Sequence, residues 1–317
     1  MKTFLLIMAA GVLAASLPAT YKETAHGNHS DHNPYKRLNH SSKNIIVKKL
    51  KLSTGVSVEF AETGNVQGTP VIFLHGFTDS WKSFSTVAAT LPPYMRGLFI
   101  SLRGHGESDK PTTGYTPKTF SADLSAFMDE LNIKSAIIIG HSMGATISQQ
   151  FAIDYPAKVN GLVLAASFST FLNNEAVTEM NEYLLNLPDA PDNNFIRLFQ
   201  QSTIIKPVAP SFIDTVVNES SKLPGYVWKA IAKETLHSNL APQLKRINVP
   251  TLILWGNKDS FCRKQDVEQL LSAIPHAKLI EYDGTGHAIH WEEPVKFVED
   301  IDDFIRSLQG LQGLNPE

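Results

Sequence analysis

A serine lies between two glycines in the segment GHSMG, residues 140–144. The segment follows a short apolar run, AIIIG at 136–140, and precedes a stretch whose apolar residues have helical spacing. A G-x-S-x-G sequence between a strand and a helix predicts a sharp, strained turn that lifts the serine oxygen above a sheet. Gly140 and Gly144 remove the side chains that would collide in such a turn. A serine that only caps the helix is the simpler alternative, but strand, turn and helix together favour Ser142 as a nucleophile.

Two further residues complete the chemistry that such a serine requires. A serine hydroxyl is a poor nucleophile until a base takes its proton and a third group orients the base. Asp259 follows the apolar run at 251–255, and His287 lies in the segment GTGH, before a helix expected from Pro294. The chain order serine, acid, histidine is the order used with this kind of turn. We therefore predict that Ser142, Asp259 and His287 act together, the alternatives being a surface-turn aspartate and a packing histidine.

His290 is a rival for the role of base, because it lies three residues after His287. Its neighbours Trp291 and Glu292 suit the entry into the last helix, whereas the glycines of GTGH place His287 in an exposed loop. We therefore prefer His287 as the base.

A tetrahedral oxyanion needs two donors that point at one place. The segment VIFLHGFTDSW puts Gly76 just beyond an apolar run, where a glycine lets the next amide, that of Phe77, turn toward the site. The amide of Met143 follows the serine at the positive end of its helix. We predict these two amides as the oxyanion donors. An ordinary turn at Gly76, before a helix that starts near Ser80, is the alternative.

These residues need a sheet edge that brings them together, and the apolar pattern predicts one. Short continuous apolar runs are typical of buried parallel strands. They occur at 71–75, 98–102, 136–140, 161–166 and 251–255. A stretch with helical spacing, Thr119 to Leu131, lies among them, and alternating segments at 45–52 and 56–62 indicate an antiparallel pair. The sequence therefore predicts an α/β fold, a mostly parallel sheet of about eight strands flanked by helices.

The regular pattern lapses between Phe171 and Asn248. This stretch is polar and punctuated by prolines, so we predict a helical cap at 171–248, inserted into a core of 44–170 and 249–310. Such an insertion covers the carboxyl edge of a parallel sheet, where ligands bind. Its large aromatic residues are Tyr183, Phe195, Phe199, Phe212, Tyr226 and Trp228. Most of them are expected to pack the cap onto the core, and the others to line an apolar pocket.

The first residues have the pattern of a secretory signal. Residues 1–19 combine a positive Lys2, an apolar run and small residues near the end, which predicts a cleaved signal peptide and an exported protein, periplasmic or secreted. An uncleaved anchor is the alternative, but the run is shorter than a spanning helix of about 20 residues, so no membrane span is expected after cleavage. Residues 20–43 are polar and predict a disordered leader. Its histidines lack partners at metal-ligand spacing, so no metal site is predicted; they are His26, His29, His32 and His40.

Charge and cysteine content limit the partners of the chain. The net charge is −3 and the pI is near 6.4, which gives no basic patch, so a nucleic-acid partner is not expected. Cys262 is the only cysteine, which excludes an intramolecular disulfide. Stability must therefore come from the core, and the oligomeric state stays open.

Together these motifs resemble the α/β-hydrolase fold family, in its serine-nucleophile, esterase- or lipase-like group with an inserted helical cap. The resemblance runs from about Ile45 to Leu308 and rests on HGFTDSW, RGHGESD, GHSMG, WGNKD and GHAIHWEEP in the family's order. It implies the same three catalytic residues and the same two oxyanion amides that the local patterns predict.

The resemblance has a departure and an exclusion. By similarity, RGHGESD is the loop after the fourth strand, and it implies that Arg103 is structural. Relatives commonly carry an acidic residue just before this loop, where this chain has Ser101, so any network built on that carboxylate must be made differently. Haloalkane dehalogenases and epoxide hydrolases of this fold use an aspartate nucleophile, and position 142 is serine, which excludes their chemistry.

The sequence thus predicts a serine hydrolase that cleaves a carboxylic ester or lactone through an acyl-enzyme, without a cofactor. No run of like charges marks the cap, so small or medium uncharged esters are the expected substrates. The same constellation also resembles amidases, carbon–carbon bond hydrolases and cofactor-free perhydrolases, and a receptor on this fold can keep a slow triad. These alternatives stay open at the level of the sequence.

Overall fold

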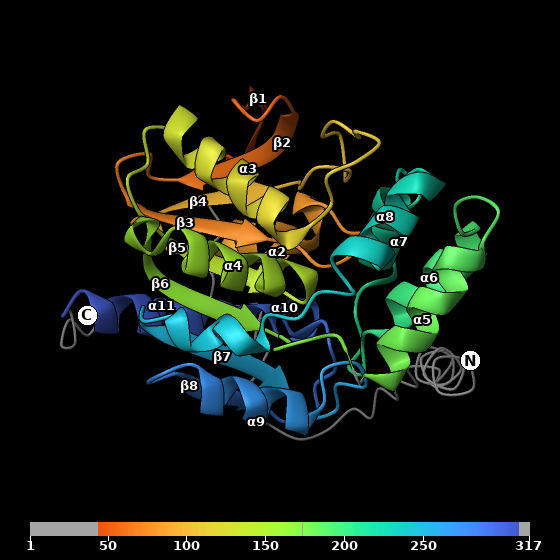
Figure 1. The fold of residues 1–317 in the computed structure, drawn as a ribbon. Coiled ribbons are helices and arrows are strands. Elements are labelled where there is room, and N and C mark those ends of the chain that lie inside the picture. Colours follow the sequence, from red (N-terminus) through yellow and green to blue (C-terminus); the bar gives the residue numbers. More distant parts are fainter. Residues whose placement is uncertain (1–43, 173, 311–317) are drawn as a thin grey trace, which may run out of the picture.

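The structure, a computed structural model, describes residues 44–172 and 174–310 of the 317-residue chain. Within this part the chain forms an eight-stranded sheet in the order β1-β2-β4-β3-β5-β6-β7-β8 (Figure 1). The strands are β1 (Ile46–Lys51), β2 (Ser57–Gly64), β3 (Thr69–Leu74), β4 (Met95–Ile100), β5 (Ala136–His141), β6 (Val159–Ala165), β7 (Thr251–Gly256) and β8 (Lys278–Tyr282). The predicted signal segment 1–19 and leader 20–43 lie outside the described residues.

The sheet is mostly parallel. β1 and β2 form an antiparallel hairpin, and β2 pairs antiparallel with β4, whereas every later pair is parallel. The central strands β3 to β7 are buried along most of their length, which continuous apolar runs require when helices cover both faces of a sheet. The predicted fold class is therefore confirmed.

Helices pack on both faces of the sheet and form two cores (Figure 1). One face carries α3 (Pro117–Glu130), α4 (Met143–Asp154) and α9 (Lys264–Ala273). The other face carries α2 (Ser85–Thr90), α10 (Ile289–Glu292) and α11 (Pro294–Leu308). Short 3-10 helices are η2 (Trp81–Phe84), η3 (Pro156–Lys158) and η4 (Ala241–Arg246).

The helix expected over 119–131 begins two residues earlier, at Pro117. The Thr116 side chain accepts a hydrogen bond from the Thr119 amide, and a proline is tolerated at the first helical position because the N–H it lacks has no partner there. The cap residue and the proline therefore fix where α3 starts.

In the described residues, four α-helices are inserted between β6 and β7, ahead of the short η4. These inserted helices are α5 (Glu175–Asn186), α6 (Asn193–Ser202), α7 (Pro210–Ser220) and α8 (Gly225–Glu234). They lie beyond the carboxyl ends of the central strands, at the right of Figure 1. Their buried apolar side chains, among them Leu184, Ile213 and Trp228, join the core that contains α3 and α4. The inserted helices thus cover the sheet edge at which the predicted site residues lie.

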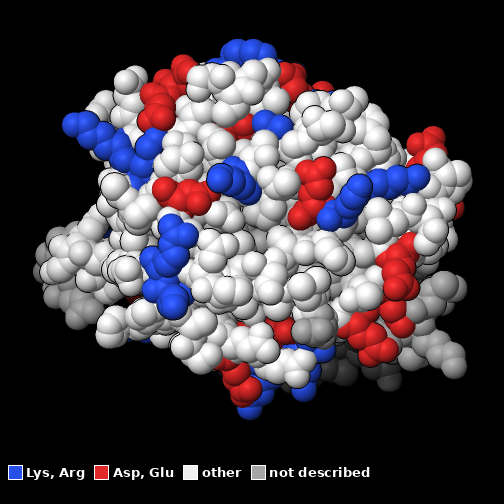
Figure 2. Space-filling model, in the orientation of Figure 1, with Lys and Arg blue, Asp and Glu red and all other residues white. Residues whose placement is uncertain are grey.

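The surface carries no single dominant charge on the face seen in Figure 2, where basic and acidic side chains are interspersed. In residues 44–172 and 174–310, no helix combines the length and the apolar character that crossing a bilayer needs.

Candidate active site

Ser142 occupies the turn between β5 and α4 with φ 53° and ψ −115°. A positive φ is uncommon for a residue with a side chain, and strain of this kind persists only where the surroundings enforce it. A Cβ at Gly140 would lie 2.3 Å from the Gly144 carbonyl oxygen, and one at Gly144 would lie 2.2 Å from that of Leu74. The two glycines therefore let α4 start directly against the strand ends. The Ser142 side chain makes no capping hydrogen bond.

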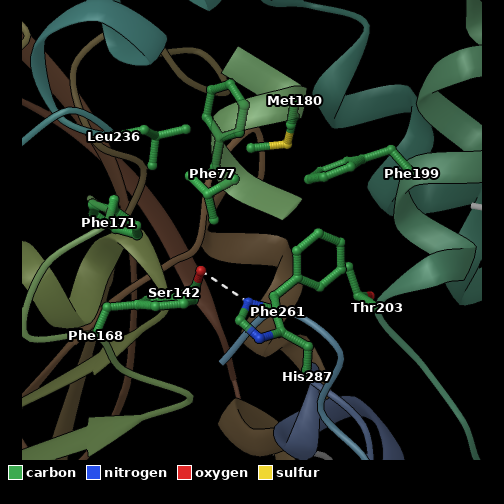
Figure 3. Close-up of a pocket in the computed structure, with 11 residues that line it drawn as sticks. Phe77, Ser142, Phe168, Phe171, Met180, Phe199, Thr203, Leu236, Phe261 and His287 are labelled. Atoms are coloured by element: carbon green, nitrogen blue, oxygen red, sulfur yellow. Dashed lines mark hydrogen bonds between the residues drawn. The ribbon is translucent and has the colours of Figure 1, made fainter. Parts of the chain in front are cut away.

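The Ser142 hydroxyl instead faces His287 (Figure 3). Its Oγ lies 2.9 Å from Nε2 of His287, and Nδ1 of the same ring lies 2.7 Å from Oδ2 of Asp259. Because a carboxylate only accepts, Nδ1 carries the proton and Nε2 is left to accept from the serine. Oδ1 of Asp259 accepts from the amides of Phe261 at 2.8 Å and Cys262 at 2.9 Å, so both carboxylate oxygens are engaged.

The sheet topology explains why these residues meet. Ser142 directly follows β5, while Asp259 and His287 lie in the loops after the neighbouring strands β7 and β8. A Cβ at Gly256, the last residue of β7, would lie 2.3 Å from the carbonyl oxygen of Gly286. This close approach brings the histidine loop, residues 283–288, against the end of β7. The three predicted residues are thus brought together as one hydrogen-bonded chain.

The β3 loop, residues 75–80, is held by a neutral histidine. The Leu102 amide donates to Nε2 of His75 at 3.0 Å, and Nδ1 of His75 donates to the Gly76 carbonyl at 2.8 Å. Burial lowers the pKa of His75 well below its ordinary value, which keeps the ring neutral. In a trans peptide the N–H points opposite to the preceding carbonyl, so the Phe77 amide is directed away from His75.

The two amides predicted as oxyanion donors start from adjacent strands, since Leu74 pairs with Gly140. Within residues 44–172 and 174–310, neither Phe77 nor Met143 donates a hydrogen bond from its amide. Met143 is the first residue of α4, where amides have no partner in the helix and carry its positive end. A Cβ at Gly76 would lie 2.8 Å from Nδ1 of His141, so that glycine is required by close packing.

A cavity encloses Ser142 and His287, and its walls are almost entirely apolar. Its cavity volume is about 30 Å³, well below the usual range for ligand pockets. The remaining lining residues are Phe77, Phe168, Phe171, Val177, Met180, Phe199, Thr203, Leu236 and Phe261 (Figure 3). An enclosed space with this lining suits an apolar group attached to a polar reacting centre.

Of the six aromatic residues singled out in the inserted segment, Phe199 alone lines this cavity. Trp228 packs on Phe77, a lining residue, and the centroids of the two rings are 5.1 Å apart. The others pack elsewhere: Tyr183 stacks on Phe195, Phe212 contacts Trp291, and Tyr226 is exposed at the surface.

Sequence analysis missed the aromatic residues that lie in loops, namely Phe168, Phe171 and Phe261. A signal was present, because Phe168 follows β6 and Phe261 follows β7 within a few residues. Apolar side chains just past the carboxyl ends of parallel strands face the site by position.

His290, the rival base, is fully buried in the short helix α10. Neither of its ring nitrogens has a hydrogen-bond partner within the part of the chain that the structure describes. Its ring packs on Phe84 at 4.4 Å and on His141 at 4.5 Å. His141 in turn donates from Nε2 to the His287 carbonyl at 3.0 Å, and burial lowers its pKa to about 3. Both rings therefore support the histidine loop as neutral groups.

Two buried carboxyls that sequence analysis did not select flank the site. Asp79 lies in the β3 loop, and burial raises its pKa to about 7. Glu292 follows the histidine loop, accepts from the amides of Gly286 at 2.9 Å and Lys206 at 2.6 Å, and also has its pKa raised to about 7 by burial. Glu292 therefore holds two backbone segments beside the site.

The loop RGHGESD is structural, as the resemblance implies for Arg103. Its guanidinium forms two hydrogen bonds with the buried Asp123 carboxylate, at 2.5 and 2.8 Å, and donates a third to the Gly114 carbonyl at 3.0 Å. Just before this loop, the Ser101 hydroxyl donates a hydrogen bond to the carboxylate of Glu59 on β2.

No metal centre accompanies the site in the described residues, where no group of three or more His, Cys, Asp or Glu side chains is arranged to hold an ion. The leader histidines lie outside the described residues.

Comparison with known proteins places the chain in a family. A family model described as alpha/beta hydrolase fold matches residues 69–294. Lipase 3 of a Moraxella species is 28% identical over 258 residues, which cover 78% of this chain and 80% of that protein. Lipase 1 of Psychrobacter immobilis is 26% identical over 265 residues, covering 78% and 80%.

Solved structures show the same fold. An esterase from Exiguobacterium antarcticum superposes with a TM-score of 0.75 at 22% identity, covering 82% of this chain and 100% of that chain. A bromoperoxidase from Bacillus anthracis gives a TM-score of 0.72 at 18% identity, covering 83% and 100%. Likeness at this identity shows architecture, on which different chemistries occur. Since the family model spans most of the chain, the protein belongs to the α/β hydrolase fold family.

Proposed function

We propose that the protein is a serine hydrolase that cleaves carboxylic esters or lactones through an acyl-enzyme on Ser142. The observation that carries the proposal is the hydrogen-bonded chain from Ser142 through His287 to Asp259. Ser142 and His287 line an apolar cavity. The lipase names of two relatives add support from outside the structure.

Acylation follows from the geometry of these groups. As Oγ of Ser142 attacks the ester carbonyl carbon, its proton passes to Nε2 of His287, which lies 2.9 Å from Oγ. The carbonyl oxygen becomes an oxyanion, which the amides of Phe77 and Met143 stabilise. Asp259 holds the ring in one tautomer and balances its positive charge. The intermediate then collapses, and the leaving alcohol receives the proton from His287.

Deacylation uses the same groups in the opposite sense. A water molecule gives a proton to His287 and attacks the acyl carbon, and the second tetrahedral intermediate expels the Ser142 oxygen, which regains its proton. The products are a carboxylic acid and the free enzyme. Each proton and electron pair comes from substrate, water or the chain itself, so the proposed reaction requires no cofactor.

The cavity indicates the kind of acyl group. Apart from Ser142, Thr203 and His287, its lining is apolar, and it holds no lysine, arginine or carboxylate. A charged group would lose its hydration there without a partner. We therefore propose uncharged esters with a short to medium apolar acyl chain as substrates.

The test is hydrolysis of p-nitrophenyl esters of increasing acyl length by the wild-type protein and by a Ser142→Ala variant purified in parallel. The wild type should turn over, and removal of the nucleophile should lower kcat by about 10⁶-fold. Equal rates in the two proteins would refute the assignment.

The same pair of proteins separates the other reactions that this constellation resembles. Amides, carbon–carbon bond substrates and peracid formation are assayed next if esters are inert. Tight ligand binding with weak turnover would instead indicate a receptor.

We also propose that the protein is exported after cleavage at the end of the segment 1–19, because that segment has the charge and apolar pattern of a signal peptide. N-terminal sequencing of the protein recovered from its native host tests this, and an intact Met1 would contradict it.

A further inference from the structure

The residue after Phe77 has an unusual backbone. Thr78 has φ 72°, a value that a β-branched residue rarely adopts. Its neighbour Asp79 is fully buried, with a carboxyl group that forms no salt bridge among the described residues. A strained backbone and a buried acid persist only where the surroundings hold them in place. The question is what holds them.

The holding groups come from the inserted helices. The side-chain amide nitrogen of Gln200, on α6, lies 3.0 Å from Oδ1 of Asp79 and 3.1 Å from Oγ1 of Thr78. The Ser220 hydroxyl on α7 lies 2.8 Å from the same nitrogen, so its two N–H bonds are shared among three oxygens. Oγ1 of Thr78 lies 3.0 Å from that same hydroxyl. Gln200 is 1% exposed, so the amide competes with no solvent for these partners.

A second link lies close by. Nζ of Lys82, on η2 directly after the β3 loop, lies 2.8 Å from Oε1 of the buried Glu219 on α7. The end of α6 also contacts the other side of the site, since the Thr203 carbonyl accepts from the amides of His287 at 2.9 Å and Ala288 at 3.0 Å. The carboxyl end of α6 therefore touches both loops that form the site.

We propose that Gln200 is a positioning residue for the β3 loop: its amide holds Thr78 and Asp79 so that the Phe77 N–H stays directed at the oxygen of a tetrahedral intermediate. This inference rests on the proposed function. Loss of one oxyanion donor lowers kcat by about 10²- to 10³-fold. If the Phe77 N–H is present but misdirected, kcat should therefore fall by a smaller factor.

The most direct test is binding of phenylboronic acid, measured by calorimetry, because it reports the tetrahedral state without turnover. The Ser142 oxygen bonds to boron, its proton passes to His287, and one boron-bound oxygen occupies the oxyanion position. Gln200→Leu should raise the Kd for the boronic acid by about tenfold or more and lower kcat for an ester by the same factor, with KM nearly constant.

Three further variants keep the test interpretable. Gln201→Leu, the same change one residue along α6, should match the wild type. Gln200→Glu keeps the shape of the side chain without its N–H donors, and it should raise the Kd for the boronic acid at least as much as Gln200→Leu does. Asp79→Asn keeps an acceptor oxygen for Gln200 and should stay within about threefold of the wild type, as expected for a retained neutral hydrogen bond.

The two proposals fail separately. If Gln200→Leu and Gln200→Glu bind the boronic acid as the wild type does, the positioning role is wrong while the serine hydrolase assignment stands. Equal loss in Gln201→Leu, or loss that only follows a lower melting temperature, also overturns it. A wild-type protein that forms no boron adduct and whose ester turnover survives Ser142→Ala overturns both.

Discussion

The hydroxyl of Ser101 donates a hydrogen bond to the carboxylate of Glu59, with Oγ 3.0 Å from Oε2. Glu59 lies on β2 and Ser101 directly follows the neighbouring strand β4, and the Ser101 amide also donates to the Glu59 carbonyl at 2.9 Å. The serine oxygen accepts from the Trp81 amide at 3.2 Å, where η2 begins. The Glu59 carboxylate thus places an acid from β2 beside the RGHGESD loop, whose Glu107 amide donates to it at 3.4 Å.

An aspartate at position 101 should be tolerated only if the carboxylate of Glu59 is removed. Ser101→Asp alone sets two acids side by side at buried positions, and we expect it to lower the free energy of unfolding by about 3 kcal/mol, since one charge is left without a partner. The double variant Glu59→Ser, Ser101→Asp should recover most of that loss. Urea unfolding of the three variants at pH 7.5 measures both effects. A double variant no more stable than Ser101→Asp would show that the two positions are not interchangeable.

Asp259 should act through the orientation and charge of His287. In Asp259→Asn the amide oxygen is retained by the amides of Phe261 and Cys262, so the NH2 group faces Nδ1 of His287 and favours the wrong tautomer. We therefore expect kcat to fall by about 10⁴-fold. Steady-state kinetics on the preferred ester measures this. Asp266→Asn is a suitable control because Asp266 caps α9 away from the cavity. A loss under tenfold in Asp259→Asn would mean that this carboxylate is not the orienting group.

The residues that follow strands were predictable, and those on the inserted helices were not. Ser142, Asp259 and His287 each follow a strand of a parallel sheet, so topology alone brings them to one edge. Gln200 meets Asp79 across 121 positions of the chain, from a helix whose placement no local pattern specifies. Glu59 was not predicted for a related reason, because its partner Ser101 lies 42 positions away, just after another strand.

Met180 should limit the length of the acyl group. Its side chain projects from α5 into the cavity (Figure 3), and it is 5% exposed. Met180→Ala opens space there, so kcat/KM for the longest ester that is hydrolysed should rise relative to the shortest by about tenfold, the effect of one or two methylene groups in an apolar pocket. Leu185→Ala, at an exposed position of the same helix, is the control. An unchanged chain-length profile would place the acyl group elsewhere in the cavity.

Four buried histidines make stability depend on pH. Burial lowers the pKa of His105 to about 4 and of His141 to about 3, and lowers those of His75 and His290 well below the ordinary value. In the unfolded chain these histidines bind protons with a pKa near 6.5, whereas in the folded chain they stay neutral. The free energy that they contribute to folding is therefore complete above pH 6.5 and declines below it.

Two carboxyls oppose this trend. Asp79 and Glu292 have pKa values raised to about 7, so between pH 4.5 and 7 the folded protein holds protons that the unfolded chain releases. Their contribution to stability therefore grows as the pH falls. The histidines are more numerous, so the net free energy of unfolding should still decrease from pH 6.5 to 5.

His290 allows the histidine effect to be measured by itself, because its ring packs on Phe84 and Phe297 and its nitrogens have no partner among the described residues. Replacing it with leucine removes one proton uptake on unfolding, so between pH 7.5 and 5.0 the variant should lose about 2 kcal/mol less than the wild type. Urea unfolding at the two pH values gives this difference, with His237→Gln as the control because His237 is exposed. If His290→Leu and the wild type lose the same free energy, the buried ring takes up its proton without unfolding, and acid stability is set by other groups.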